Sequence, residues 1–200
     1  MKQVTASELK ELDPKRFASV YEKWRAYCLD HGWWDCVYEH FIGRCAALGV
    51  RVDDMTFTGF WSQGDGAAFA GRVSLAEFMK SQGLDEQYPA LYLGVVDDGS
   101  YLRVGFEGNN MRCADYGMYA NQTAPSGMFS NLDQLAWEEL LEEQENDAAL
   151  EDRVMKYCNG LANELYRDLE KEYDYLTSEE QFIASCEGNE ITFETTEETA

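Results

Sequence analysis

Residues 51–73 read RVDDMTFTGFWSQGDGAAFAGRV, and this stretch decides the fold class. Its first half, residues 51–62, is rich in Thr, Phe and Trp, the residue types that strands favour. Gln63-Gly64-Asp65-Gly66 follows, and residues 67–73 are again rich in small and apolar types. Glycine adopts a positive φ without steric cost, so Gly64 and Gly66 suit a tight turn. The stretch therefore predicts a β-hairpin.

The chain after this hairpin predicts a short helix and then more strands. Ser74-Leu75-Ala76-Glu77 has the spacing of a capping box and opens a helix that ends near Gln82. Residues 90–96, 100–106 and 111–120 are extended, apolar-rich runs separated by turn residues, which is typical of an antiparallel meander. Residues 189–194 predict one last strand.

Helical patterns flank these strands on both sides. Asp13-Pro14 predicts a helix start, and residues 14–30 and 33–48 form two amphipathic segments joined at His31-Gly32, which together predict a helical hairpin. Residues 131–177 have helical periodicity, and Thr177 or Ser178 caps a short final helix. Apolar residues recur there every three or four positions: Leu150, Val154, Cys158, Leu161, Leu165 and Leu169.

These patterns predict an α+β fold with an N-terminal helical hairpin, an antiparallel sheet of about four strands and acidic C-terminal helices. We expect residues 1–130 to form the hairpin and sheet, and residues 131–200 to form an acidic helical region packed on them in one compact domain. The N-terminus lacks an apolar signal core and no stretch is long enough to span a membrane, which predicts a soluble cytoplasmic protein.

The net charge of -22 is concentrated at the C-terminal end of the chain. Residues 131–200 hold 21 acidic and 4 basic residues, a net charge of -17, whereas residues 1–130 carry -5. Such a surface repels nucleic-acid phosphates and attracts a basic partner. The alternative interpretation is that the acidity only keeps the protein soluble.

The densest acidic segment suggests where a partner would bind. Carboxylates at helical spacing lie about 5–6 Å apart at their Cβ atoms, close to the phosphate spacing along a nucleic-acid strand, so this segment is a candidate nucleic-acid mimic. Its acidic residues are Glu138, Glu139, Glu142, Glu143, Glu145 and Asp147.

Motifs for catalysis or for cofactors are weak. Cys28, His31, Cys36, His40 and Cys45 have residue types that zinc uses, but no CxxC pair reinforces them, and buried thiols are the simpler interpretation. Ser62 and Asp65 lack the surroundings of a nucleophile elbow. Gly64, Gly66 and Gly71 do not form a phosphate loop. We therefore predict no catalytic residue, no metal and no cofactor.

Aromatic side chains crowd the predicted hairpin. In a strand, Phe57 and Trp61 would share one face while Phe60 pointed to the other. One set is expected in the core, and the other is either an exposed binding surface or packs beneath the helices.

Two stretches carry a resemblance to a known family. Phe57-Thr58-Gly59-Phe60-Trp61-Ser62-Gln63-Gly64-Asp65-Gly66-Ala67 resembles the F-x-G-F-W-S-Q-G-D-G-A signature of a family of small tailed-bacteriophage proteins. Residues 170–179 (EKEYDYLTSE) are similar to a second stretch of those proteins, E-x-E-Y-D-Y-L-T-S-D/E. The family largely lacks an assigned activity, so the resemblance implies an origin and a fold.

A phage origin favours one hypothesis. Small acidic phage proteins without enzymatic motifs often bind a host machine, so we expect an inhibitor of a host restriction or CRISPR complex, with nucleic-acid mimicry as one way in which it would act. One alternative is an enzyme or ligand-binding domain that uses the glycine-rich hairpin around Trp61 and Asp65. The other is a scaffolding or interaction protein of phage development.

Overall fold

The computed structural model describes residues 2–106, 111–119 and 147–195. The chain forms two compact units. Unit 1 contains residues 1–35 and 169–200, and unit 2 contains residues 36–168. These boundaries differ from the division expected at residue 130. Residue 130 itself lies outside the described residues.

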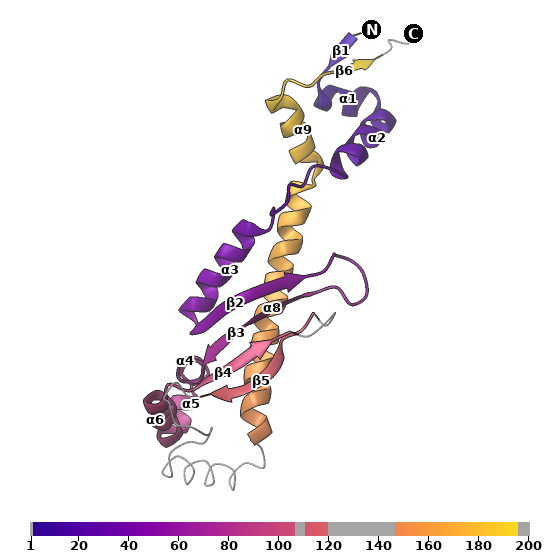
Figure 1. Cartoon of the computed structure of the whole chain (residues 1–200). Coiled ribbons are helices and arrows are strands. Elements are labelled where there is room, and N and C mark those ends of the chain that lie inside the picture. Colours follow the sequence, from indigo (N-terminus) through magenta and orange to yellow (C-terminus); the bar gives the residue numbers. More distant parts are fainter. Residues whose placement is uncertain (1, 107–110, 120–146, 196–200) are drawn as a thin grey trace. The chain divides into compact units, whose positions relative to one another are not determined.

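Unit 1 joins the two ends of the chain. It contains β1 (Lys2–Val4), α1 (Ala6–Leu12), α2 (Pro14–Arg25), the C-terminal part of α8 (Asp147–Leu176), α9 (Glu179–Gly188) and β6 (Phe193–Thr195). β1 and β6 pair antiparallel, with Gln3 opposite Glu194 (Figure 1). An unpredicted capping box begins α1: the Thr5 hydroxyl accepts from the Glu8 amide, and the Glu8 carboxylate accepts from the Thr5 amide. Asp13 and Ser178 cap α2 and α9.

The core of unit 1 is aromatic. The Phe182 ring is buried among the rings of Phe17, Tyr21 and Trp24, with ring centroids 5.3–5.8 Å away. Leu9 and Cys186 are buried in the same cluster. The predicted apolar face of residues 14–30 is therefore confirmed, and it packs against α9.

Unit 2 is built on a four-stranded antiparallel sheet in the order β2-β3-β4-β5. Its strands are β2 (Val50–Phe57), β3 (Ala67–Ser74), β4 (Tyr101–Gly105) and β5 (Ala114–Tyr119). Its helices are α3 (Asp35–Ala47), α4 (Leu75–Ser81), α5 (Leu84–Gln87), α6 (Pro89–Asp98) and the N-terminal part of α8. The α+β class and the four-stranded sheet agree with the prediction.

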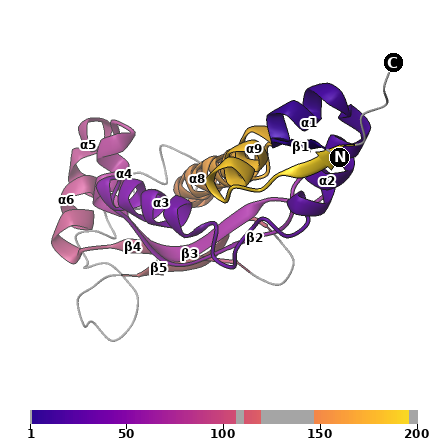
Figure 2. The same ribbon diagram turned by 90° about the horizontal axis from the view of Figure 1, so that it is seen from above.

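One face of this sheet is covered by α3 and by the part of α8 that belongs to unit 2 (Figures 1 and 2). Phe41 of α3 meets Phe69 of β3 with ring centroids 5.6 Å apart. The Cys113 amide donates to the Asn159 side chain of α8 at 3.1 Å. On α8 the predicted apolar stripe is buried from Val154 to Leu169.

The prediction of a strand at residues 90–96 is wrong, because these residues lie within helix α6. Pro89 stands in the first turn of α6, where a missing N–H costs nothing, and Gly99 ends the helix with φ +59°. Leu91 and Val95, four residues apart, are buried, while Leu93 is exposed. The apolar residues therefore follow a helical period that the short apolar run did not reveal.

Two further expectations are corrected. The segments 14–30 and 33–48 do contain helices, but α2 belongs to unit 1 and α3 to unit 2, so they do not form a hairpin within one unit. Strand β2 ends at Phe57, so the alternation expected between Phe57 and Trp61 does not extend that far. Residues 58–66 form the connection to β3 instead.

Candidate functional site

Three arginines stand side by side across the sheet of unit 2. Arg51 of β2 is opposite Arg72 of β3, and Arg72 is opposite Arg103 of β4. All three side chains are exposed. Their neighbours along the strands, Val50, Val73 and Leu102, are buried, so the arginines point to the face opposite the one that α3 and α8 cover. We call these three residues the arginine row.

Directly opposed like charges destabilise a sheet, and the row is only partly neutralised. The Arg51 Nε atom lies 2.9 Å from the Asp53 carboxylate. The Arg72 guanidinium lies over the Tyr101 ring, 5.0 Å from its centroid. Within the described part of the chain, Arg103 forms no ion pair. A cluster of cations is thus held on the sheet of a strongly acidic protein.

Two members of the row open into a pocket of about 490 Å³. We call it the basic pocket. Strands β2, β3 and β4 form one side of it, and helices α4 and α6 form the other. The polar and aromatic lining residues are Arg51, Arg72, Ser74, Glu77, Lys80, Tyr92, Ser100 and Tyr101.

The helical side of the basic pocket adds a third cation. The Lys80 ammonium of α4 lies 5.8 Å from the centroid of the Tyr92 ring. The pKa of Lys80 is raised, first by its hydrogen bond with Tyr92 and then by the nearby negative charge of Glu77. Lys80 is therefore positively charged at neutral pH. Ser100 is only 4% exposed, and its hydroxyl has no hydrogen-bond partner among the residues that the structure describes.

The loop that carries the glycine-rich motif is tightly bonded. The Asp65 carboxylate accepts from the Ser62 amide at 2.7 Å, and the Thr58 amide donates to the Gly66 carbonyl at 3.0 Å. Asp65 is thus a turn residue, as its position between glycines suggested. Trp61 has φ +70°, a conformation that costs a bulky L-residue about 1–2 kcal/mol.

Aromatic rings support this loop from beneath. Phe60 is half-buried. Its ring stacks with that of Phe57 at a centroid distance of 6.0 Å and packs against the Tyr166 ring of α8 at a centroid distance of 5.5 Å. Trp61 meets Phe60 at 5.6 Å, yet 62% of Trp61 is exposed. Phe60 therefore anchors the loop to α8, and Trp61 presents a large apolar surface to solvent.

Unit 1 has a pocket of opposite charge, about 470 Å³ in volume, which we call the acidic pocket. It lies where α8 ends and α9 begins, and α1 contributes Lys10. Asp174, Glu179 and Glu180 are exposed there. Among the residues that the structure describes, Glu179 is the one of these three with an ion-pair partner, the Lys10 ammonium at 2.6 Å. The remaining lining residues are Tyr175, Ser178 and Ile183.

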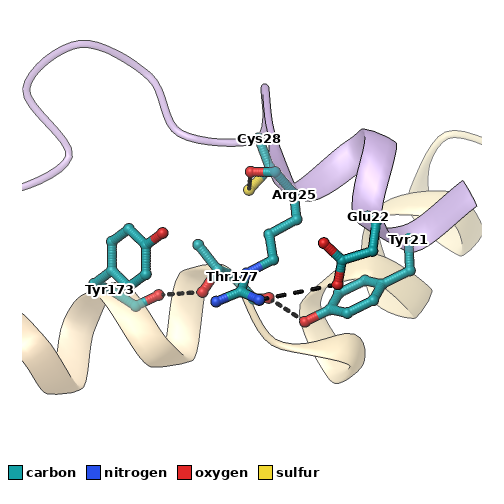
Figure 3. A network of polar contacts seen from close by, with 6 residues as sticks. All are labelled: Tyr21, Glu22, Arg25, Cys28, Tyr173 and Thr177. Carbon is teal, nitrogen blue, oxygen red and sulfur yellow. Dashed lines mark hydrogen bonds and ion pairs between the residues drawn. The ribbon is translucent and has the colours of Figure 1, made fainter. Parts of the chain in front are cut away.

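A polar network beside this pocket fixes the junction of α8 and α9. The Tyr21 hydroxyl of α2 donates to the Thr177 carbonyl at 2.7 Å, and the Thr177 hydroxyl donates to the Tyr173 carbonyl at 2.8 Å (Figure 3). The Cys28 thiol and the Arg25 side chain lie alongside (Figure 3). Burial raises the pKa of Tyr21, so its hydroxyl stays protonated and keeps donating.

The residues that the sequence singled out for partner binding are placed only in part. Glu138, Glu139, Glu142, Glu143 and Glu145 lie outside the described residues, and Asp147 is the first residue of α8. The basic pocket was not predicted from the sequence. Its arginines look like ordinary exposed strand positions until the strand register aligns them.

The cysteines are mostly buried thiols, as predicted. Cys45, Cys113, Cys158 and Cys186 are buried, whereas Cys36 is exposed. Burial raises the pKa of Cys45 to about 12 and that of Cys113 to about 11. Among the described residues, no group of three or more Cys, His, Asp or Glu side chains has the arrangement of a metal site.

Comparison with known proteins identifies the family. Residues 33–179 match the model described as "Domain of unknown function (DUF8835)". The chain belongs to this family. The match begins just before α3, includes the whole of unit 2 and ends at the start of α9, so the basic pocket lies entirely within the DUF8835 domain.

No curated protein and no solved structure matches the chain. The described helices include none that is both long and apolar enough to cross a membrane.

Proposed function

We propose that this DUF8835 protein is encoded by a bacteriophage and acts in the host cytoplasm, where it binds and inhibits a nucleic-acid-handling defence complex of the restriction or CRISPR type. Its electronegative surface would occupy a basic surface that otherwise holds nucleic acid. The protein would work by binding, without a catalytic step.

The observation that carries this proposal is the distribution of charge. Residues 131–200 have a net charge of -17, and six acids fall within residues 138–147. An electrostatic surface of this kind accelerates association with an oppositely charged partner and selects against partners of like charge.

Unit 1 adds exposed carboxylates to this surface. Glu187, Glu190 and Glu194 are exposed on and after α9, in addition to the acids of the acidic pocket. Among the described carboxylates of α9, Glu179 is the one held in an ion pair, and its partner Lys10 is itself about half exposed. These acids therefore keep most of their charge available to a partner.

The proposal is tested by comparing two triple variants. Glu138/Glu142/Glu145→Gln removes three charges from the densest segment, and Glu11/Glu39/Glu86→Gln removes three exposed carboxylates from residues 1–130, outside the acidic C-terminal region, as a matched control. We expect the first variant to bind the captured host complex at least tenfold more weakly than the wild type, and the control to lose less than threefold. Affinities are measured by surface plasmon resonance at low salt, with the complex isolated from host lysate.

Equal losses of affinity in the two variants would show that net charge matters and the 138–147 segment does not. Unchanged affinity of the first variant would contradict mimicry.

The loop of residues 58–66 supports a second candidate function, the binding of a ligand at Trp61. The supporting observation is that Trp61 combines an unfavourable φ with an exposed ring, and such strain concentrates at functional sites.

Replacing this residue tests whether the strain serves the structure. Trp61→Gly relieves the positive φ, and we expect the free energy of unfolding to stay within about 0.5 kcal/mol of the wild type. Phe60→Ala, which removes the ring between Phe57 and Tyr166, should cost at least about 2 kcal/mol. Urea denaturation measures both. A loss above about 2 kcal/mol for Trp61→Gly would show that Trp61 stabilises the fold, and the ligand-binding hypothesis would lose its support.

A further inference from the structure

We propose that the basic pocket of unit 2 binds a phosphorylated small molecule of about mononucleotide size. This inference concerns a different unit and the opposite charge from the proposed function, and it does not depend on it. It rests on the arginine row, on the residues of the facing helices and on the dimensions of the pocket.

The arginine row supplies the argument for an anion. Opposite residues on neighbouring strands have Cβ atoms about 4.5–5.5 Å apart, so Arg51 and Arg72 repel each other across β2 and β3. The Asp53 carboxylate offsets part of the charge of Arg51, and a tyrosine ring faces Arg72. A dianionic phosphate between the two guanidinium groups would convert this repulsion into charge-assisted hydrogen bonds, for which the planar guanidinium is well suited.

The positive charges enter the pocket from both of its sides. Lys80 reaches the pocket from α4, whereas Arg51 and Arg72 reach it from the sheet. Three cations from three separate elements thus line one space, and Glu77 is the one carboxylate among the described lining residues. A lysine ammonium acts as a point charge on phosphate and complements the two arginine forks.

The rest of the lining indicates a ligand larger than phosphate. A volume of about 490 Å³ lies in the range of pockets that hold small organic ligands. Tyr92 and Tyr101 offer aromatic surface to a planar group. Glu77 accepts hydrogen bonds from hydroxyl groups such as those of a ribose, and Ser100 adds a buried hydroxyl that has no partner among the described residues. Phosphate, sugar and ring together are the parts of a mononucleotide.

The arginine row also contains its own control residue. Arg103 is exposed and stands next to Arg72 in the row, but it does not line the pocket. Arg103→Gln therefore removes the same charge from the same face of the sheet without removing a pocket side chain. A difference between the two variants separates a site from a diffuse electrostatic attraction.

The experiment is isothermal titration calorimetry of the full chain with AMP, adenosine, ribose 5-phosphate and inorganic phosphate as probes. We expect AMP to bind, adenosine to bind at least tenfold more weakly, and inorganic phosphate to bind more weakly than ribose 5-phosphate. Arg72→Gln and Lys80→Gln should each weaken AMP binding at least tenfold, and Arg103→Gln less than threefold. Circular dichroism and thermal unfolding of each variant show whether the fold is retained.

Several results would overturn the proposal. If AMP shows no measurable binding at concentrations up to about 10 mM, the proposed site does not exist. Adenosine binding as tightly as AMP shows that the cations are not used. Equal losses for Arg72→Gln and Arg103→Gln show that the attraction is diffuse. None of these outcomes bears on the proposal that the acidic segment binds a host complex, so the two proposals can fail independently.

Discussion

Phe182→Ala is expected to lower the free energy of unfolding of unit 1 by roughly 3–5 kcal/mol, the usual cost of emptying a buried aromatic site. The Phe182 ring is 2% exposed and fills the space between Phe17, Tyr21 and Trp24. Urea denaturation followed by hydrogen exchange measures the loss.

The location of the loss is as informative as its size. Because the two units have separate cores, amides of α1, α2 and α9 should lose protection more than those of β2 and β3. Phe182→Leu retains most of the apolar volume and should cost less than half as much. Uniform loss of protection over both units would contradict the assignment of Phe182 to a core of unit 1 alone.

Gly71→Ala is expected to destabilise unit 2 by about 3 kcal/mol, at the upper end of the usual range for overpacking. Gly71 of β3 is opposite Val52 of β2. A β-carbon at Gly71 would collide with the Arg51 carbonyl oxygen and would lie 3.1 Å from the Arg51 carbonyl carbon and 3.2 Å from the Val52 Cα atom. All three atoms belong to the backbone, so no side-chain rotation relieves the collision and the two strands must separate.

Gly160→Ala is the matched control for this change. Gly160 lies within helix α8, and a β-carbon there meets no atom within 4 Å. Alanine has a higher helix propensity than glycine, so this variant should be stabilised by up to about 1 kcal/mol. Thermal unfolding of both variants gives the comparison. A Gly71→Ala protein as stable as the wild type would show that β2 and β3 are not as close as the structure places them.

The sequence was sufficient to predict the fold class and most elements, because their signals are local. Asp13-Pro14 and Ser74 begin helices where their capping chemistry predicts. The Gly-Asp-Gly motif lies in the connection of a β-hairpin, as expected. Residues 90–96 were one exception, since a short apolar run has no period that separates a strand from a buried helix.

The division into units was not predictable in this way. Unit 1 forms from residues 1–35 and 169–200, and the pairing of β1 with β6 joins segments about as far apart in sequence as the chain permits. The basic pocket escaped prediction for the same reason. Arg51 and Arg72 become neighbours through strand register, and Lys80 joins them through the placement of α4. None of these relations leaves a motif in the sequence.

The proposal that the acidic surface binds a basic host complex is tested most directly by the salt dependence of that binding. The Debye length is about 10 Å at 0.1 M salt and about 3 Å at 1 M, so raising salt from about 0.05 to about 0.5 M screens an electrostatic interface strongly. We predict that the dissociation constant of the wild-type protein and the captured host complex rises at least a hundredfold over this range. A dissociation constant that changes less than threefold would contradict an electronegative binding surface.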